Sequence, residues 1–440
     1  MKIAFIAAGA AHMYCGSCLR DNALARRLLR LGHDVLFVPL YTPLRVDRDP
    51  VPGPRVFYGG INIYLRTRWP FFRRLGTLAR LLDSPSVLRL AARLGGMTQA
   101  ADLGPLTVAT VRGDEGELRG EAEALAHWLA EAYRPDLINL PNALLAGLAR
   151  PLKAATGAAV VCTLSGEDLF LDQMVEPFKS QTLEILRARL REVDRFIAIS
   201  EHYAASAAEL FGLPRSRIDV VPIGLDPSGF GRSGAPSGPF TIGYLARIDP
   251  AKGLHLLVEA LAGLRATPET AEARLAAAGY LGPEHRSYWR RVQEEARRRG
   301  LEAAFQYHGE LTFEGKLRFL DGVHVLSVPT VHPEPKGLFV LEALAHGVPV
   351  VMPRHGAFPE LIERTGGGLL FEPGDAAGLA DQLRRLALDP PLADHLSRQG
   401  RAAVLSRFTD EAMARRTLEV YEKCVARAGE RPADLLGVGA

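Results

Sequence analysis

Two glutamates, Glu334 and Glu342, stand eight positions apart in the segment 333–351, and carboxylates at this spacing could bind a sugar. Residues 325–328 form an apolar run typical of a buried strand, and helical periodicity begins at Gly337. Glu334 is therefore predicted in a strand-to-helix loop and Glu342 inside the helix. Open α/β folds bind ligands at this edge of the sheet, where an ionised carboxylate accepts hydrogen bonds from adjacent hydroxyls. Taken alone, the pair is more typical of a helix cap and a solvated side chain.

Two cations, Arg247 and Lys252, lie in the segment GYLARIDPAKG at positions 243–253. Both follow a predicted strand, and Lys252 stands where a helix begins. Bare cations at a helix N-terminus oppose the helix dipole, which disfavours a purely structural role. Together they can neutralise a diphosphate, the arginine as a bidentate fork and the lysine as a point charge. His308 ends another predicted strand and is expected at the same edge of the sheet.

The loop GAAHMYCGS, residues 9–17, follows the first predicted strand and precedes a helix. Its glycines, Gly16 among them, leave the backbone free to approach an anion at the helix start. Cys15 and Cys18 also form a candidate redox or metal motif. A zinc site needs two more ligands at matched spacing, and the other two cysteines of the chain are isolated. The segment is therefore interpreted as a phosphate loop.

The elements that must position these residues alternate between strand and helix, as in doubly wound parallel sheets. The first series of expected strands is 2–8, 33–40, 136–140, 158–164, 195–199 and 219–223. The second series is 240–245, 273–278, 305–308, 323–328, 348–352 and 368–371. Between them lies PSGFGRSGAPSGP, a Gly-, Pro- and Ser-rich stretch that is typical of a linker.

The domain organisation follows from this alternation and from length. A chain of 440 residues exceeds one ordinary core, and 48% hydrophobic with 23% charged residues describes a globular protein. We expect a first Rossmann-like domain over 1–226, a linker over 227–239, and a second Rossmann-like domain over 240–405. A helical tail, 406–440, is expected to pack on the first domain.

Charge and hydropathy limit the partners and the location. A formal net charge of +3 is too small to indicate nucleic acid. The N-terminus begins with a strand-like run rather than a basic leader and an apolar core, and no window approaches 18 uninterrupted apolar residues. We therefore expect a cytoplasmic protein.

Residues 61–100 differ from the rest, because they contain seven arginines and one aspartate, a net charge of +6. Trp69, Phe71 and Phe72 are interleaved with these arginines. This composition favours an anionic membrane surface or an anionic acceptor. The alternative is a solvated helical insertion whose aromatic side chains pack inward.

Taken together, these motifs resemble the retaining GT-B glycosyltransferases, in particular glycosyltransferase family 4. The resemblance spans nearly the whole chain. It rests on the N-terminal glycine loop with LGHDV, FIAIS at 196–200, DVVPIGLD at 219–226, GYLARIDPAKG, and the E-x7-E element with EALAHGVPVV. It implies two Rossmann-like, doubly wound domains that face a cleft between them, with a C-terminal helix returning to the first domain.

The resemblance also implies roles for individual residues. Arg247 and Lys252 would hold the donor diphosphate, and Glu342 would bind the ribose hydroxyls. Glu334 would contact the transferred sugar. The expected donor-binding residues further include Gly16, His308, Gly337, Leu338 and Phe339, with Gly16 approaching the diphosphate from the other domain.

The chain departs from the family pattern after the strand 158–164, where family members often carry a histidine that faces the reacting sugar. Here Ser165 stands in that place. A serine can donate a hydrogen bond to a sugar hydroxyl but cannot serve as the same acid or base. Cys15 and Ile223 are further departures from the family pattern. The resemblance therefore implies the sugar and the acceptor less directly than it implies the fold.

The expected function is a retaining, metal-independent transfer of a hexose from a nucleoside diphosphate sugar, such as a UDP-sugar, without a cofactor. No DxD-like pair stands at a predicted strand end. The expected acceptor is unidentified, with a lipid-linked or cell-envelope glycan suggested by residues 61–100. Two alternatives are a GT-B-fold nucleotide-sugar epimerase or hydrolase and a non-catalytic sugar-binding protein. The epimerase would consume donor without an acceptor.

Overall fold

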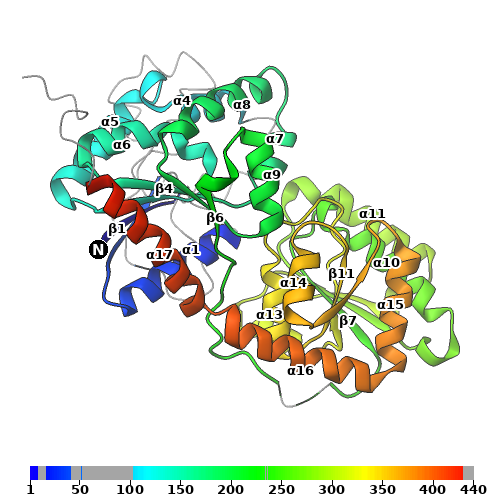
Figure 1. Cartoon of the computed structure of the whole chain (residues 1–440). Helices are drawn as coiled ribbons and strands as arrows, with labels where there is room; N and C mark the ends of the chain where they lie inside the picture. Colours follow the sequence, from blue (N-terminus) through cyan, green and yellow to red (C-terminus); the bar gives the residue numbers. More distant parts are fainter. Residues whose placement is uncertain (8–15, 41–50, 52–102, 233, 235, 430–440) are drawn as a thin grey trace, which may run out of the picture. The chain divides into compact units, whose positions relative to one another are not determined.

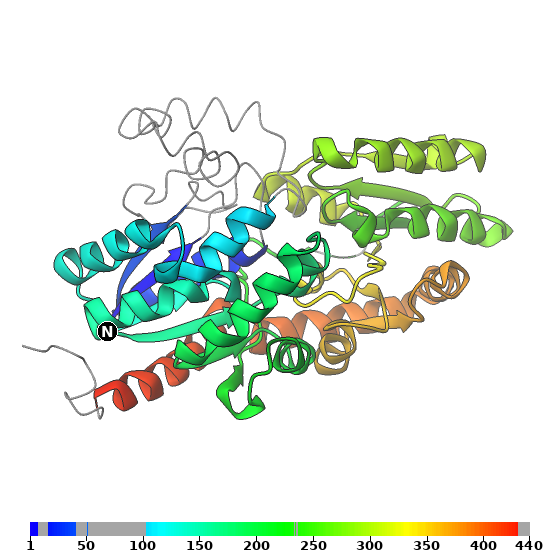
Figure 2. The ribbon, with the colours of Figure 1, turned by 90° about the horizontal axis from the view of Figure 1, so that it is seen from above.

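The computed structural model describes residues 1–7, 16–40, 51, 103–232, 234 and 236–429 (Figures 1 and 2). The chain divides into two compact units. The first contains Met1–Pro222 and the chain from Met413, and the second is Ile223–Ala412. Each unit has a six-stranded sheet, and every strand pairing in both sheets is parallel.

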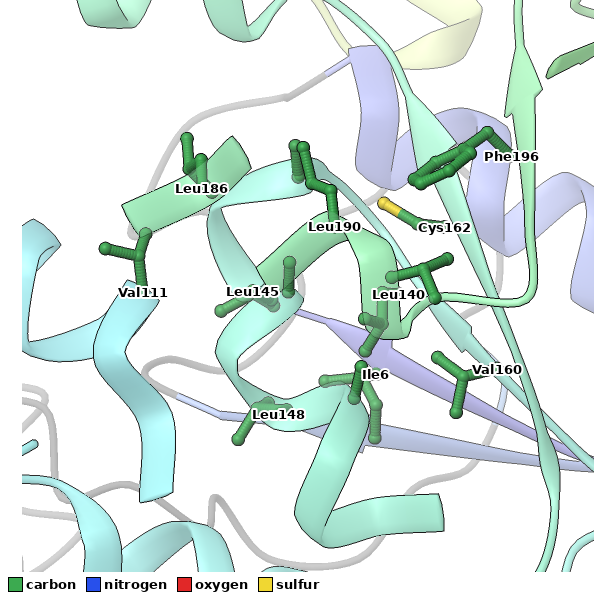
Figure 3. Packing of buried hydrophobic residues seen from close by; sticks show 14 of the residues in the cluster. Ile6, Val111, Leu140, Leu145, Leu148, Val160, Cys162, Leu186, Leu190 and Phe196 are labelled. Carbon is green, nitrogen blue, oxygen red and sulfur yellow. The ribbon is translucent and has the colours of Figure 1, made fainter. Parts of the chain in front are cut away.

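The sheet of the first unit has the strand order β2-β1-β3-β4-β5-β6. Its strands are β1 (Lys2–Ala7), β2 (Asp34–Pro39), β3 (Leu137–Leu140), β4 (Ala159–Leu164), β5 (Arg195–Ala198) and β6 (Ile218–Val220). Because side chains alternate along a strand, the sheet has a core on each of its faces. Ile6 and Val160 point into one core, which Figure 3 shows from close by, and Phe5 and Val161 into the other.

Helices cover both faces of this sheet. The core containing Ile6 is covered by α4 (Gly104–Arg112), α5 (Arg119–Ala132), α6 (Ala149–Thr156), α7 (Glu167–Asp172), α8 (Phe178–Arg189) and α9 (Glu201–Phe211). The core containing Phe5 is covered by α1 (Gly16–Arg30) and by α17 (Asp410–Gly429), which brings the C-terminal part of the chain back to this sheet (Figure 1).

The sheet of the second unit has the strand order β12-β11-β10-β7-β8-β9. Its strands are β7 (Thr241–Leu245), β8 (Arg274–Ala278), β9 (Phe305–Tyr307), β10 (Val325–Leu326), β11 (Val350–Pro353) and β12 (Gly368–Phe371). One face packs on α10 (Leu254–Arg265), α11 (Arg286–Arg298) and α15 (Ala376–Leu388). The other packs on α12 (Phe313–Asp321), α13 (Leu338–His346) and α14 (Phe358–Thr365), and α16 (Pro390–Arg407) reaches both cores.

The two doubly wound parallel sheets confirm the fold class expected from the sequence, and all twelve expected strands are present. Some are shorter than expected. The strand expected at 219–223 is only β6, which ends at Val220. One further ladder bond follows, from the Val221 N–H to the Ala198 carbonyl at 2.9 Å. Pro222 then has no N–H to continue the ladder.

The stretch expected as a linker, 227–239, packs in part on the second unit. The Phe230 ring meets Phe313 edge to face at 5.4 Å. The Gly231 N–H donates to His346 Nδ1 at 3.2 Å, and Arg232 donates to the Val323 carbonyl at 2.6 Å. These contacts explain why the stretch belongs to a compact unit despite its composition.

The chain enters and leaves the second unit at one place. The Leu225 N–H donates to the Phe408 carbonyl at 3.0 Å, and the Asp410 N–H donates to the Leu225 carbonyl at 2.8 Å. A Cβ on Gly224 would lie 2.2 Å from the Thr409 oxygen, so this crossing requires glycine. The expected tail, 406–440, is therefore divided: residues up to Ala412 belong to the second unit and the rest of α17 to the first.

None of the helices in the described ranges combines the length and the apolar character that a bilayer crossing requires.

Candidate active site

The predicted donor-binding residues of the second unit follow the carboxyl ends of its strands. Arg247 and Lys252 come after β7, and Glu334 comes after β10, the neighbouring strand. Glu342 lies in α13, the helix that follows. His308 comes after β9, which is separated from β7 by β8.

A short turn brings Lys252 to the end of β10. Asp249 caps the 3-10 turn Pro250–Lys252 by accepting a hydrogen bond from the Ala251 N–H at 2.9 Å. Gly253 then adopts φ +71°, and a Cβ there would lie 1.8 Å from the Pro329 carbonyl oxygen. The turn is thus pressed against the chain leaving β10.

Lys252 Nζ contacts Glu334 Oε2 in an ion pair, although the two residues are 82 positions apart. Glu334 is only 6% exposed. Its other carboxylate oxygen accepts from the Lys336 N–H at 3.1 Å and lies 3.4 Å from the Gly337 nitrogen. Burial alone would raise the pKa of Glu334, but the Lys252 ammonium and the surrounding donors lower it to about 2. The carboxylate is therefore ionised at neutral pH.

The backbone of Glu334 is fixed as firmly as its side chain. The Ala357 N–H donates to the Glu334 carbonyl at 2.8 Å. Gly356 lies so close that a Cβ there would be 2.5 Å from the Glu334 nitrogen and oxygen. The position of the carboxylate is thus set by contacts within the folded chain.

Arg247 is held less tightly than Lys252. Its guanidinium lies 3.5 Å from Asp249 Oδ2, and about a third of the side chain is exposed. The Tyr244 hydroxyl donates to the Arg247 carbonyl at 2.7 Å, so the backbone is fixed while the guanidinium reaches toward solvent. This combination leaves the charge available to a diphosphate.

Helix α13 begins at the predicted backbone position. Gly337 precedes it with φ +67°, a left-handed conformation that glycine adopts without strain. Leu338 and Phe339 form its first turn, whose N–H groups lack helical partners and suit an anion or a sugar oxygen. The Phe339 ring centroid lies 6.0 Å from Lys252 Nζ, which places this turn beside the ion pair.

Glu342 is buried and forms an ion pair with Lys316, a residue that was not among the predicted site residues. Its Oε1 lies 2.6 Å from Lys316 Nζ on α12. Lys316 sits in a helical pattern with no motif around it, so the sequence carries no signal for this contact.

His308 lies apart from the Lys252–Glu334 pair. Its N–H continues the β8–β9 ladder by donating to the Ala277 carbonyl at 2.8 Å. Its ring packs edge to face on Phe319 at 5.6 Å.

In the first unit, Ser165 follows β4 and is 6% exposed. Its hydroxyl lies 3.2 Å from the hydroxyl of Ser17, which is adjacent to Gly16 at the start of α1. The structure thus brings the predicted positions Gly16 and Ser165 together through Ser17. The rest of the glycine loop, including Cys15, lies outside the described residues.

A buried carboxylate holds the Ser165 loop. Glu167 Oε2 accepts from the Ser165 N–H at 2.9 Å and from the Tyr203 hydroxyl at 2.7 Å. Its Oε1 accepts from the Ala143 N–H at 2.9 Å. Burial and the neighbouring Glu167 raise the pKa of Tyr203 far above its ordinary value, so its hydroxyl remains a donor. The sequence does not single out Glu167 beyond its place two residues after Ser165.

Among the residues with described positions, no group of three or more His, Cys, Asp or Glu side chains is placed to hold a metal ion. Cys18, one half of the candidate redox motif, carries no disulfide.

Comparison with known proteins gives two adjoining family matches. The model described as "Glycosyltransferase Family 4" matches residues 105–228, and the model described as "Glycosyl transferases group 1" matches residues 229–403. The glycogen synthase of Mycobacterium tuberculosis is 28% identical over 304 residues, which are 68% of this chain and 71% of that protein.

Solved structures agree in fold. Sucrose-phosphate synthase from Thermosynechococcus elongatus has a TM-score of 0.70 at 20% identity, covering 97% of this chain and 100% of that one. HepE from Anabaena, in complex with UDP, has a TM-score of 0.67 at 19% identity, covering 96% and 100%. Both therefore share the fold of this chain over nearly its whole length. The chain therefore belongs to the GT-B glycosyltransferases of family 4.

Proposed function

We propose that this glycosyltransferase is a retaining hexosyltransferase that uses a nucleoside diphosphate sugar. The observation that carries the proposal is the contact of Lys252 with the buried, ionised Glu334 beside the start of α13. A cation suits the diphosphate of such a donor, and a fixed carboxylate suits the hydroxyls of its sugar. Arg247, on the same turn, supplies a second cation.

Donor binding would exchange one partner of Lys252 for another. In the structure the Lys252 ammonium pairs with the Glu334 carboxylate. A bound diphosphate carries more negative charge than one carboxylate and would draw Lys252 toward itself. Glu334 would then accept hydrogen bonds from the transferred sugar.

In the proposed reaction, the bond between the anomeric carbon and the diphosphate oxygen breaks, and the acceptor oxygen bonds to the same face of that carbon. The acceptor proton passes to the leaving diphosphate, so no protein nucleophile is required. Arg247 and Lys252 offset the negative charge that grows on the diphosphate, and the N–H groups at the start of α13 contribute partial positive charge. The proposal includes no metal ion, so EDTA should leave turnover intact.

A UDP-hexose is the donor we propose. HepE, whose fold this chain shares, has been solved with UDP and with UDP-glucose. Glu342 would bind the ribose, and His308 would lie toward the nucleoside. In the first unit, Ser165 and Gly16 would contact the sugar and the diphosphate, as the family resemblance implies.

The acceptor we propose is lipid-linked or otherwise close to an anionic membrane. The support is the net charge of +6 over residues 61–100 with three interleaved aromatic side chains. These residues lie outside the described part of the chain.

Proton NMR of acceptor-free donor hydrolysis tests the proposal. We expect UDP-glucose to yield α-glucose first, since a retaining site keeps the α configuration of the donor. The β-anomer would contradict retention. Formation of an epimerised UDP-sugar from UDP-glucose or UDP-N-acetylglucosamine would instead favour the epimerase.

A further inference from the structure

The two glutamates of the E-x7-E element form ion pairs with two different lysines. Glu334 pairs with Lys252, which comes from the turn after β7, and Glu342 pairs with Lys316, which comes from α12. The proposed diphosphate ligand competes for Lys252 but not for Lys316. The second pair is therefore able to persist through the reaction.

The Lys316–Glu342 pair is strongly buried. The side chains are 11% and 10% exposed, and Nζ lies 2.6 Å from Oε1. A buried carboxylate requires a counter-charge and hydrogen-bond donors, and Lys316 supplies both. An ionised carboxylate has about four lone-pair sites, more than one ammonium can fill.

Lys316 is itself held by a well-packed helix. Thr312 caps α12 by accepting from the Gly315 N–H at 3.2 Å, and the Lys316 N–H donates to the Thr312 carbonyl at 2.8 Å. The Phe313 ring centroid lies 6.0 Å from Lys316 Nζ, within the range of a cation–π interaction. Phe313 packs in turn on Phe230. The ammonium therefore has a fixed position from which it orients Glu342.

We propose that Lys316 is a positioning residue for the nucleotide site, which holds the Glu342 carboxylate in the orientation that accepts the two ribose hydroxyls. The inference rests on the proposed function, because that function assigns Glu342 to the ribose. It adds a residue on α12 that determines how well the site distinguishes a ribonucleotide from one without ribose hydroxyls.

Isothermal titration calorimetry with matched nucleotides tests this role. The probes are UDP, GDP and ADP, each beside its 2′,3′-dideoxy counterpart, and the pair whose ribonucleotide binds tightest to wild type is used. Wild type should favour the ribonucleotide by about tenfold or more, the size of one charge-assisted hydrogen bond. K316M should reduce this ratio to about twofold or less, with the loss confined mainly to the ribonucleotide. R318M, which removes an exposed cation two residues along α12, should keep the wild-type ratio.

A purely structural role for Lys316 predicts a different result, namely a lower melting temperature with an unchanged ratio, and that result would overturn the inference. K316R keeps the charge but moves the donor atoms, so it should give an intermediate ratio. If K316M does not fold, the affinity ratio of K316R is the test. A wild-type ratio in K316R overturns the positioning role.

E342Q separates this inference from the proposed function. Loss of the ratio in E342Q but not in the Lys316 variants would refute only the role of Lys316. An unchanged ratio in E342Q, or no discrimination by wild type, would refute the ribose contact of Glu342 and the inference with it.

Discussion

At the residue scale, the central feature is the buried carboxylate of Glu334 and its contact with Lys252. The pair costs desolvation energy, which the Lys336 N–H and the Lys252 ammonium offset. Such an arrangement is more than a surface ion pair, since Glu334 is 6% exposed and lies at the edge of the sheet where ligands bind. Its effects on turnover and on acid stability can be measured separately.

Glu334→Gln should lower the rate of nucleoside diphosphate release from the donor by about 10- to 100-fold, because the proposed sugar contact loses its charge. Nucleoside diphosphate affinity should not fall, since Lys252 is no longer neutralised by a carboxylate. Steady-state kinetics and calorimetry give the two quantities. Glu372→Gln, the same change at an exposed residue of the second unit, is the control. Unchanged turnover in the Glu334 variant would refute its role.

Acid should destabilise the protein through the same carboxylate. The pKa of Glu334 is lowered from its ordinary 4.5 to about 2, so its stabilising contribution is present above about pH 4.5. That contribution is lost as the pH falls toward 2, and the loss reaches about 2 kcal/mol by pH 3. Urea unfolding at pH 5 and pH 3 measures it. Wild type should lose more stability on acidification than Glu334→Gln, and equal losses would show that the carboxylate is not held as described.

At the element scale, close backbone approaches place the site. The turn that carries Lys252 rests on the chain leaving β10 through Gly253, and the Glu334 loop rests on Gly356. These two glycines connect elements that are distant in sequence. They explain how Lys252 and Glu334 are brought together by loops at the ends of two neighbouring strands.

Gly253→Ala should destabilise the protein more than Gly300→Ala. Both glycines have φ near +70°, at +71° and +69°, so both variants incur about 1–2 kcal/mol of left-handed strain. Only Gly253 adds a clash, since its Cβ would lie 1.8 Å from the Pro329 oxygen, whereas Gly300 has nothing within 4 Å. Thermal unfolding compares them. Equal losses would mean that the close approach to Pro329 is relieved without cost.

The strands and the site differ in how far the sequence predicts them. Apolar runs bounded by Gly, Pro and Asp predict all twelve strands, because burial on both faces of a parallel sheet leaves a local pattern. The Lys316–Glu342 contact leaves no such pattern in the sequence. It joins residues 26 positions apart on two helices, and depends on the phase and packing of both. The hydroxyl contact of Ser17 with Ser165 leaves no local pattern in the sequence either, because the two residues are 148 positions apart.

At the scale of the whole molecule, the chain has two units, and each is built on a parallel sheet. Helix α17 packs on the sheet that contains β1. The two cations proposed to bind the diphosphate, Arg247 and Lys252, lie in the second unit. The proposed membrane contact of residues 61–100 belongs to the other part of the chain, so the two functions should be separable by mutation.

Binding to anionic vesicles should therefore depend on residues 61–100 and on salt. Arginines near a membrane surface contribute about 1 kcal/mol each, and aromatic side chains enter the interface. Cosedimentation with phosphatidylglycerol and phosphatidylcholine liposomes at low and physiological salt measures this. Replacing Arg73 and Arg74 by Ser should weaken binding to the anionic vesicles. Equal, negligible binding to both vesicles would favour a soluble acceptor.

Arg247 and Lys252 are proposed to bind the donor diphosphate, and calorimetry with UDP, GDP and ADP measures this binding. Each alanine variant should weaken the tightest-binding nucleotide by about 10- to 100-fold, the size of a lost charge-assisted bond. Lys252→Ala should be the more severe, because it also leaves Glu334 buried without its partner. Arg318→Ala, which removes an exposed cation of α12, should bind as wild type does. Unchanged diphosphate affinity in both the Arg247 and the Lys252 variants would show that these cations do not bind the diphosphate.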